Sequence, residues 1–103
     1  IHPPDGSELN YIHIMFQWNT VEGSTEYNFQ LSSTDDFTSL LVSTNTSNLY
    51  YIEEDGIDWE SNYYWRVRAN SGDWMGPNEF STGEALSNVV VNVFNEFKEK
   101  NKY

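Results

Sequence analysis

The fold of this chain is constrained most by two segments in which large apolar side chains alternate with polar ones. Residues 25–32 place Tyr27, Phe29 and Leu31 on one face. A period of two buries one face of a β-strand, whereas a helix would scatter these side chains around its axis. The chain is therefore predicted to be all-β. The alternation is clearest in residues 63–69, where one set faces inward and another outward: Tyr63, Trp65, Val67 and Ala69 against Tyr64, Arg66 and Arg68.

Turn signals divide the chain into short segments of the kind that build a β-sandwich. Polar turns such as Glu22-Gly23-Ser24 separate the apolar runs. Short strands of this kind fit two facing sheets about 10 Å apart, with Trp18 and Trp65 filling the layer between them. The expected strands and extended segments lie at residues 2–6, 12–18, 25–32, 37–43, 49–52, 63–69 and 79–82.

Charge and composition restrict the partners. Sixteen acidic residues against five basic ones give a formal charge of −11, and this field repels nucleic-acid phosphates. Residues 1–83 carry all of the excess, because residues 84–103 sum to zero. No run of about 18 apolar residues occurs, and there is no cysteine for disulfides. We therefore expect no nucleic-acid partner and no insertion into a membrane.

Four segments together resemble a known family. They are residues 16–23 (FQWNTVEG), 27–33 (YNFQLSS), 57–69 (IDWESNYYWRVRA) and 79–82 (EFST), and they resemble the fibronectin type III domain over residues 1–83. The most specific feature is Ile57 followed by Tyr63, the spacing of the family's tyrosine corner, in which the phenol hydrogen-bonds back to the loop backbone. Trp18 matches the family's core tryptophan. The resemblance implies an immunoglobulin-like, seven-stranded β-sandwich.

The resemblance also implies a function. Domains of this type act as non-catalytic structural or interaction modules of extracellular bacterial proteins, either secreted or at the cell surface. This chain would be a spacer or a protein–protein contact whose partners are neighbouring domains or other subunits. His2 and His13 stand in no catalytic motif, and no cysteine nucleophile is present. We therefore predict that the chain is not an enzyme and carries no cofactor.

One acidic segment keeps a calcium site open as an alternative. Glu53, Glu54, Asp55 and Asp58 lie within six residues, and calcium binds closely spaced carboxylate and carbonyl oxygens. The spacing lacks the closing glutamate of a calcium loop. The preferred interpretation is a solvated turn between two strands.

Outward aromatic side chains indicate a second alternative, a carbohydrate-binding module. Trp59, Trp74 and Tyr64, together with Tyr51, could stack on the flat faces of sugar rings in a polysaccharide. The competing interpretation is that Trp59 and Trp74 cover the ends of the core, and that Tyr64 stacks on a neighbouring arginine.

Residues 84–103 lie outside the family pattern and form a C-terminal extension. A capping-box spacing at residues 81–84 and lysines near the end favour a helix, although the β-branched run at residues 89–93 also fits a strand. This segment would fold back on the sandwich, dock on another domain, or join subunits of a self-assembling surface filament or layer. Its apolar side chains recur about every four residues: Leu86, Val90, Val93, Phe94 and Phe97.

Overall fold

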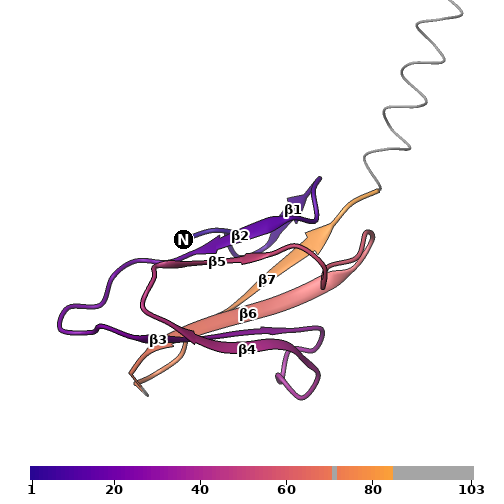
Figure 1. The fold of residues 1–103 in the computed structure, drawn as a ribbon. Coiled ribbons are helices and arrows are strands. Elements are labelled where there is room, and N and C mark those ends of the chain that lie inside the picture. Colours follow the sequence, from indigo (N-terminus) through magenta and orange to yellow (C-terminus); the bar gives the residue numbers. More distant parts are fainter. Residues whose placement is uncertain (71, 85–103) are drawn as a thin grey trace, which may run out of the picture.

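The computed structural model describes residues 1–70 and 72–84, and this part of the chain is all-β (Figure 1). No helix long and apolar enough to cross a membrane occurs in these residues. The expected helix at residues 84–103 falls on residues 85–103, which lie outside the described part. The strands are β1 (Ser7–Leu9), β2 (Ile14–Gln17), β3 (Tyr27–Ser32), β4 (Leu40–Thr46), β5 (Tyr50–Glu53), β6 (Asn62–Ala69) and β7 (Met75–Thr82).

The seven strands form two sheets in a sandwich-like arrangement. The larger sheet has the order β1-β7-β6-β3-β4, and the smaller one pairs β2 with β5. All neighbours are antiparallel except β1 and β7, which run parallel. Figure 1 shows the β2–β5 pair lying over the larger sheet. The expected all-β architecture is confirmed for this part of the chain.

A core rich in aromatic rings fills the space between the two sheets. Phe16 of β2 is fully buried and contacts three rings of the other sheet, at centroid distances of 5.0 Å to Phe29, 5.5 Å to Trp65 and 5.7 Å to Phe80. Trp18 stacks on Phe29 at 5.8 Å. Burial of side chains this large stabilises a small domain by about 1.5–3 kcal/mol for each one. Rings rather than disulfides therefore hold the two layers together.

The first residues of the chain cross from one sheet to the other. His2 forms an antiparallel bridge with Gln17 at the end of β2. Pro3 is buried, and its carbonyl accepts a hydrogen bond from the indole N–H of Trp65 at 3.3 Å. The chain then enters β1, which pairs with β7 of the larger sheet. Proline has no N–H for a sheet ladder, so Pro3 and Pro4 end the first pairing and permit the crossing.

Several expected strands have different bounds in the structure, and β1 lies outside all of the expected segments. The differences are largest for β4 and β7. The expected strand at residues 37–43 starts and ends three residues too early, because β4 runs from Leu40 to Thr46. Phe37 instead has a left-handed backbone, with φ of 58°, and its buried side chain closes the β3–β4 loop. β7 begins at Met75, four residues before the expected start at residue 79. A backbone irregularity at Gly76 hides this strand, because it interrupts the alternation of apolar side chains.

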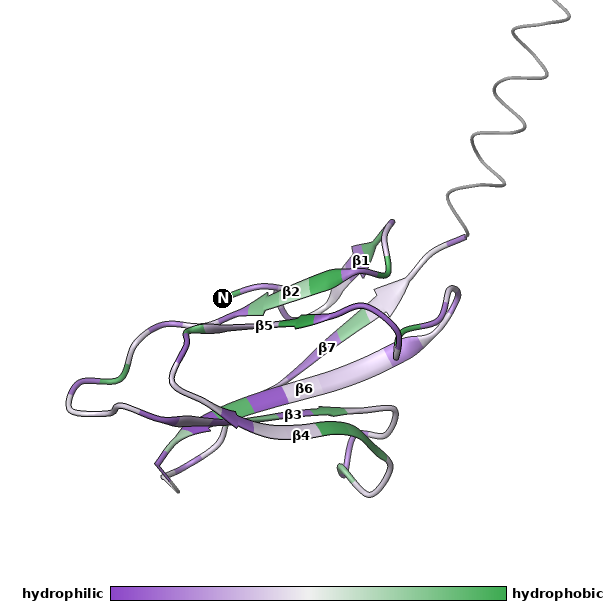
Figure 2. Cartoon of the chain, in the orientation of Figure 1, coloured by the Kyte–Doolittle hydropathy of each residue, from purple (hydrophilic) through white to green (hydrophobic). Residues whose placement is uncertain are grey.

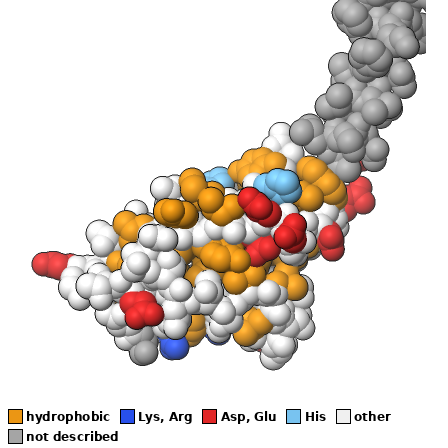
Figure 3. Space-filling view, in the orientation of Figure 1, with side chains coloured by type: hydrophobic (Ala, Val, Ile, Leu, Met, Phe, Trp, Pro, Cys, Tyr) orange, Lys and Arg blue, Asp and Glu red, His pale blue; other side chains and the backbone are white. Residues whose placement is uncertain are grey.

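The smaller sheet, β2 and β5, carries apolar side chains that are exposed to solvent. Figure 2 shows hydrophobic residues along both β2 and β5. Met15 and Ile52 are direct partners in this pair, and both point away from the core, with exposed fractions of 44% and 50%. Figure 3 shows hydrophobic side chains gathered over the same two strands. The outer face of the smaller sheet is therefore apolar at this pair, while the inner face packs on the core.

Candidate functional site

The outer face of the larger sheet carries a stack of cations and rings. The guanidinium carbon of Arg66 lies 4.1 Å from the ring centre of Phe37 and 4.2 Å from that of Trp74. The guanidinium carbon of Arg68 lies 4.4 Å from the same Trp74 ring. Both arginines stand on β6 and point outward because they alternate with buried Trp65 and Val67. The β6–β7 loop folds Trp74 back over them.

Amide side chains of the neighbouring strand β3 accept hydrogen bonds from both guanidinium groups. Arg66 donates two hydrogen bonds to Oε1 of Gln30, at 2.9 and 2.7 Å, and Arg68 donates one to Oδ1 of Asn28 at 3.0 Å. Desolvation lowers the pKa of Arg66 from its ordinary value, and the nearby charge of Arg68 lowers it further. Arg66 and Arg68 therefore contact uncharged amide oxygens on one side and aromatic rings on the other. These contacts link β3, β6 and the loops beside them, and so stabilise the larger sheet.

The three residues suggested for sugar binding do not form one platform. Trp74 and Tyr64 lie on the outer face of the larger sheet, but Trp74 is half-buried against the arginines. The charge of Glu79 raises the pKa of Tyr64. Trp59 lies in the β5–β6 loop beside residues 11–13, away from the stack. Trp74 and Phe37, rather than Tyr64, are the rings that stack on the arginines.

Tyr51 is not an outward aromatic residue, contrary to the expectation. It pairs with Phe16 in the β2–β5 ladder, so the two side chains share the core-facing side. Its ring stacks on Phe29 at 4.9 Å, and its hydroxyl donates to Oε2 of Glu53 at 2.9 Å. Desolvation, followed by the hydrogen bond to the Glu53 carboxylate and its charge, raises the pKa of Tyr51 to about 12.

The acidic segment after β5 is a turn held by one of its own carboxylates. Oε1 of Glu53 accepts the backbone N–H groups of Gly56 at 3.1 Å and Asp55 at 3.3 Å. Across residues 1–70 and 72–84, no three acidic or histidine side chains converge to hold a metal ion. Glu53, Glu54, Asp55 and Asp58 are therefore not brought together as a calcium site. Both oxygens of Glu53 already accept hydrogen bonds, Oε1 from these two N–H groups and Oε2 from the hydroxyl of Tyr51.

The residues expected to have structural roles lie in the core. Trp18, Ile57, Tyr63 and Trp65 are all buried. The hydroxyl of Tyr63 accepts the backbone N–H of Asp58 at 2.8 Å. The indole N–H of Trp18 is buried and has no hydrogen-bond partner among the described residues.

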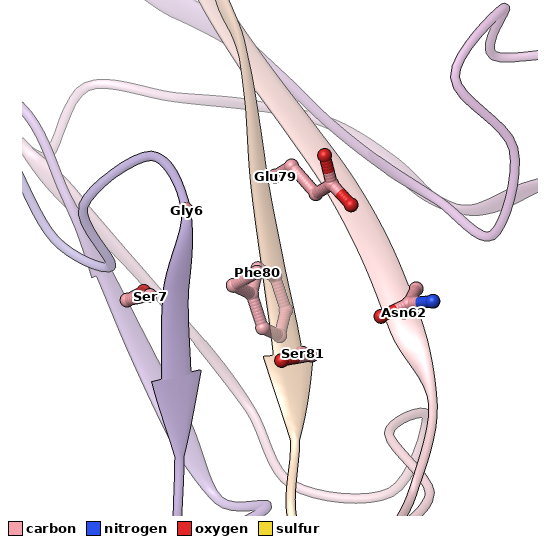
Figure 4. Close-up of a pocket in the computed structure, with 6 residues that line it drawn as sticks. All are labelled: Gly6, Ser7, Asn62, Glu79, Phe80 and Ser81. Carbon is pink, nitrogen blue, oxygen red and sulfur yellow. The ribbon is translucent and has the colours of Figure 1, made fainter.

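A shallow hollow lies where β1, β7 and β6 run side by side (Figure 4). Its volume is about 150 Å³, and its polar groups come from Ser7, Asn62, Glu79 and Ser81. Figure 4 shows the carboxylate of Glu79 directed over β6, and Asn62 and Ser81 on the neighbouring strands β6 and β7. These side chains face solvent on an open sheet and do not close around a ligand.

A second hollow lies at the end of the sandwich from which the chain leaves β7. It is formed by Tyr11, Ile12, His13 and Trp59, is largely apolar, and has a volume of about 340 Å³. His13 lines the hollow, and Nε2 of His2 lies 3.0 Å from the hydroxyl of Tyr11.

No family model matches this chain, and no curated protein or solved structure matches it. The site is therefore interpreted from its own residues.

Sequence reasoning missed the parts of the site that come from separate strands. Phe37, Gln30 and Asn28 carry no motif, yet they complete the arginine stack. A signal for the stack was present, because Arg66 and Arg68 occupy outward positions on a strand followed by a loop tryptophan. The hollow at Tyr11 and Trp59 had no such signal, since these residues are 48 positions apart. Leu86, Val90, Val93, Phe94 and Phe97 lie outside the described residues.

Proposed function

We propose that this chain is a non-catalytic spacer module of an extracellular bacterial protein. It would hold the segments before and after it, and the domains or subunits they belong to, at a fixed separation. The observation that carries the proposal is the placement of the two ends of the described chain. His2 is fixed at the Gln17 end of β2, whereas Gly83 is fixed to Leu9 where β1 and β7 end, and Figure 1 shows these two points apart on the body.

Both attachments are made by the backbone, which supports a rigid body. The N–H of His2 donates to the carbonyl of Gln17 at 2.9 Å, and the N–H of Gln17 donates to the carbonyl of His2 at 2.8 Å. At the other end, the N–H of Gly83 donates to the carbonyl of Leu9 at 2.9 Å. A chain tied in this way transmits both orientation and distance to the segment attached at its C-terminal end.

The fibronectin type III resemblance supports the same proposal. The order β4-β3-β6-β7, facing β2-β5, is compatible with a sandwich of that kind, and β1 adds a parallel strand beside β7. The contact between the Tyr63 hydroxyl and the backbone of Asp58 has the form of the family's tyrosine corner. The family's extracellular location and its spacer role come to this chain through that resemblance.

The separation of the two ends can be measured directly, because the chain has no cysteine of its own. Ile1→Cys and Glu84→Cys introduce two exposed labelling sites for nitroxide spin labels. Pulsed electron spin resonance should give one narrow distance distribution, unchanged when a folded domain is fused to either end. A broad distribution, or labels that lie close together, would overturn the spacer role.

A further inference from the structure

The chain leaves the sandwich between two backbone segments that hold it on both sides. The N–H of Gly83 donates to the carbonyl of Leu9, and the carbonyl of Gly83 accepts the N–H of Glu60 at 3.0 Å. Thr82 fixes the second segment, because its hydroxyl donates to the carbonyl of Asp58 at 2.7 Å. The position of Gly83 is therefore set by the body on both sides.

The same two segments form the walls of the apolar hollow at this end. Tyr11 comes two residues after Leu9 and is 37% exposed, and Trp59 directly precedes Glu60. The hollow of about 340 Å³ lies between them, with Ile12 and His13 completing it. An apolar hollow is thus placed beside the point at which the C-terminal segment begins.

Residues 85–103 have the side chains and the length to cover this hollow. Leu86 comes three residues after Gly83, so an extended backbone brings it up to about 10 Å from the anchored position. Val90 comes four residues later, at the spacing that places both side chains on one face of a helix. The start of the segment therefore offers the hollow two apolar side chains close in sequence to the anchored Gly83.

Charge distinguishes this segment from the other candidate occupant, a second copy of the body. Residues 1–84 hold fourteen acidic residues against two arginines, a formal charge of −12. Two such bodies repel each other. Residues 85–103 hold three lysines against two glutamates, a formal charge of +1, and are the part of the chain that the acidic body attracts. Asp58 and Glu60 flank Trp59 and add to this attraction.

We propose that residues 85–103 dock on their own body, with Leu86 and Val90 packed into the hollow formed by Tyr11, Ile12, His13 and Trp59. The docked segment shields the Trp59 ring from water. It also continues the rigid body beyond Gly83, so that the next part of the chain leaves in a fixed direction.

The test uses the full chain and the fluorescence of Trp59. Leu86→Glu places a charge where the proposal needs an apolar side chain. Asn88→Glu is the matched control, because it adds the same charge to the same segment away from the Leu86–Val90 face. Each substitution is also made together with Trp59→Phe, so that the contribution of Trp59 is obtained by difference from the other three tryptophans.

Leu86→Glu should red-shift the Trp59 emission and raise its acrylamide quenching constant, while Asn88→Glu should leave both unchanged. The difference should disappear in the Trp59→Phe chains. Equal quenching in the original and Leu86→Glu chains overturns the proposal, as does a difference that persists without Trp59. The proposal is also overturned if Trp59 is protected from acrylamide only at concentrations where sedimentation gives the mass of a dimer. In that case the segment that covers the hollow comes from a second copy of the chain. The distance between positions 1 and 84 does not involve this segment, so failure here leaves the spacer measurement unaffected.

Discussion

The hydroxyl of Tyr63 accepts the backbone N–H of Asp58 at 2.8 Å, and this hydrogen bond joins the start of strand β6 to the loop before it. Ile57, next to Asp58, is buried in the core, so one contact fixes both the depth and the path of the acidic loop. Thr82 of β7 holds the same loop from the other side through the carbonyl of Asp58. The end of the sandwich at which the chain leaves is therefore organised around this loop.

Tyr63→Phe should lower the free energy of unfolding by about 1–3 kcal/mol, because it leaves the partly buried N–H of Asp58 without an acceptor. Tyr64→Phe is the matched control on the outer face and should change stability by less than about 0.5 kcal/mol. Urea denaturation followed by tryptophan fluorescence measures both. Equal midpoints for the two variants would remove the structural role of the Tyr63 hydroxyl.

The arginine stack should show measurable coupling. A double-mutant cycle with Trp74→Ala and Arg66→Met should give a coupling free energy of about 0.5–1 kcal/mol, the usual worth of a solvent-accessible cation–π contact. The control cycle pairs Trp74→Ala with Met15→Ala, which lies on the other sheet, and should be additive. Coupling of the same size in both cycles would mean that the stack contributes nothing specific.

Gly76→Ala should destabilise the domain more than Gly23→Ala. Both glycines have a positive φ, 117° and 82°, so both substitutions carry backbone strain of about 1–2 kcal/mol. A Cβ at Gly76 would also lie 3.1 Å from the carbonyl oxygen of Trp65, whereas a Cβ at Gly23 meets nothing within 4 Å. Chemical denaturation of the two variants measures the loss of unfolding free energy in each. An equal loss would show that β6 and β7 can move apart to accommodate a Cβ at position 76.

Stability should fall at high pH through Tyr51. Its folded pKa is raised to about 12, above the ordinary value of 10.0, so the folded state holds this proton more tightly than the unfolded state. The contribution is complete below pH 10 and is lost as the pH rises toward 12. Tyr51→Phe should therefore flatten the decline in melting temperature over this window. An unchanged slope in the variant would assign the decline to other groups.

Calcium should have no specific effect on the melting temperature. The carboxylate of Glu53 is engaged in hydrogen bonds within the protein, and no three acidic or histidine side chains of residues 1–70 and 72–84 converge on a metal position. Millimolar Ca²⁺ and Mg²⁺ should act alike, since both only screen an acidic surface. A rise with Ca²⁺ alone that Glu53→Gln abolishes would restore the calcium site.

The burial of individual side chains could be predicted closely from the sequence where strands alternate without interruption. β3 and β6 could be placed to within two residues, because their inward positions are all large and apolar. β4 could not be placed in this way. Its apolar residues Leu40 and Leu41 are exposed, and the buried ring that precedes them, Phe37, belongs to a loop with a left-handed backbone. Alternation identifies a strand only when its two faces differ in environment.

Residues 1–84 determine by themselves that this part of the chain forms strands and which side chains form the core, because the period of two and the size of the rings are local properties. The tertiary structure decided what the outward side chains do. Trp74 lies over the two arginines, Tyr51 lies in the core, and Tyr11 and Trp59 share a hollow, because strand pairing brings together residues that are far apart in sequence. Pairing depends on the register between strands, and no single segment contains that information.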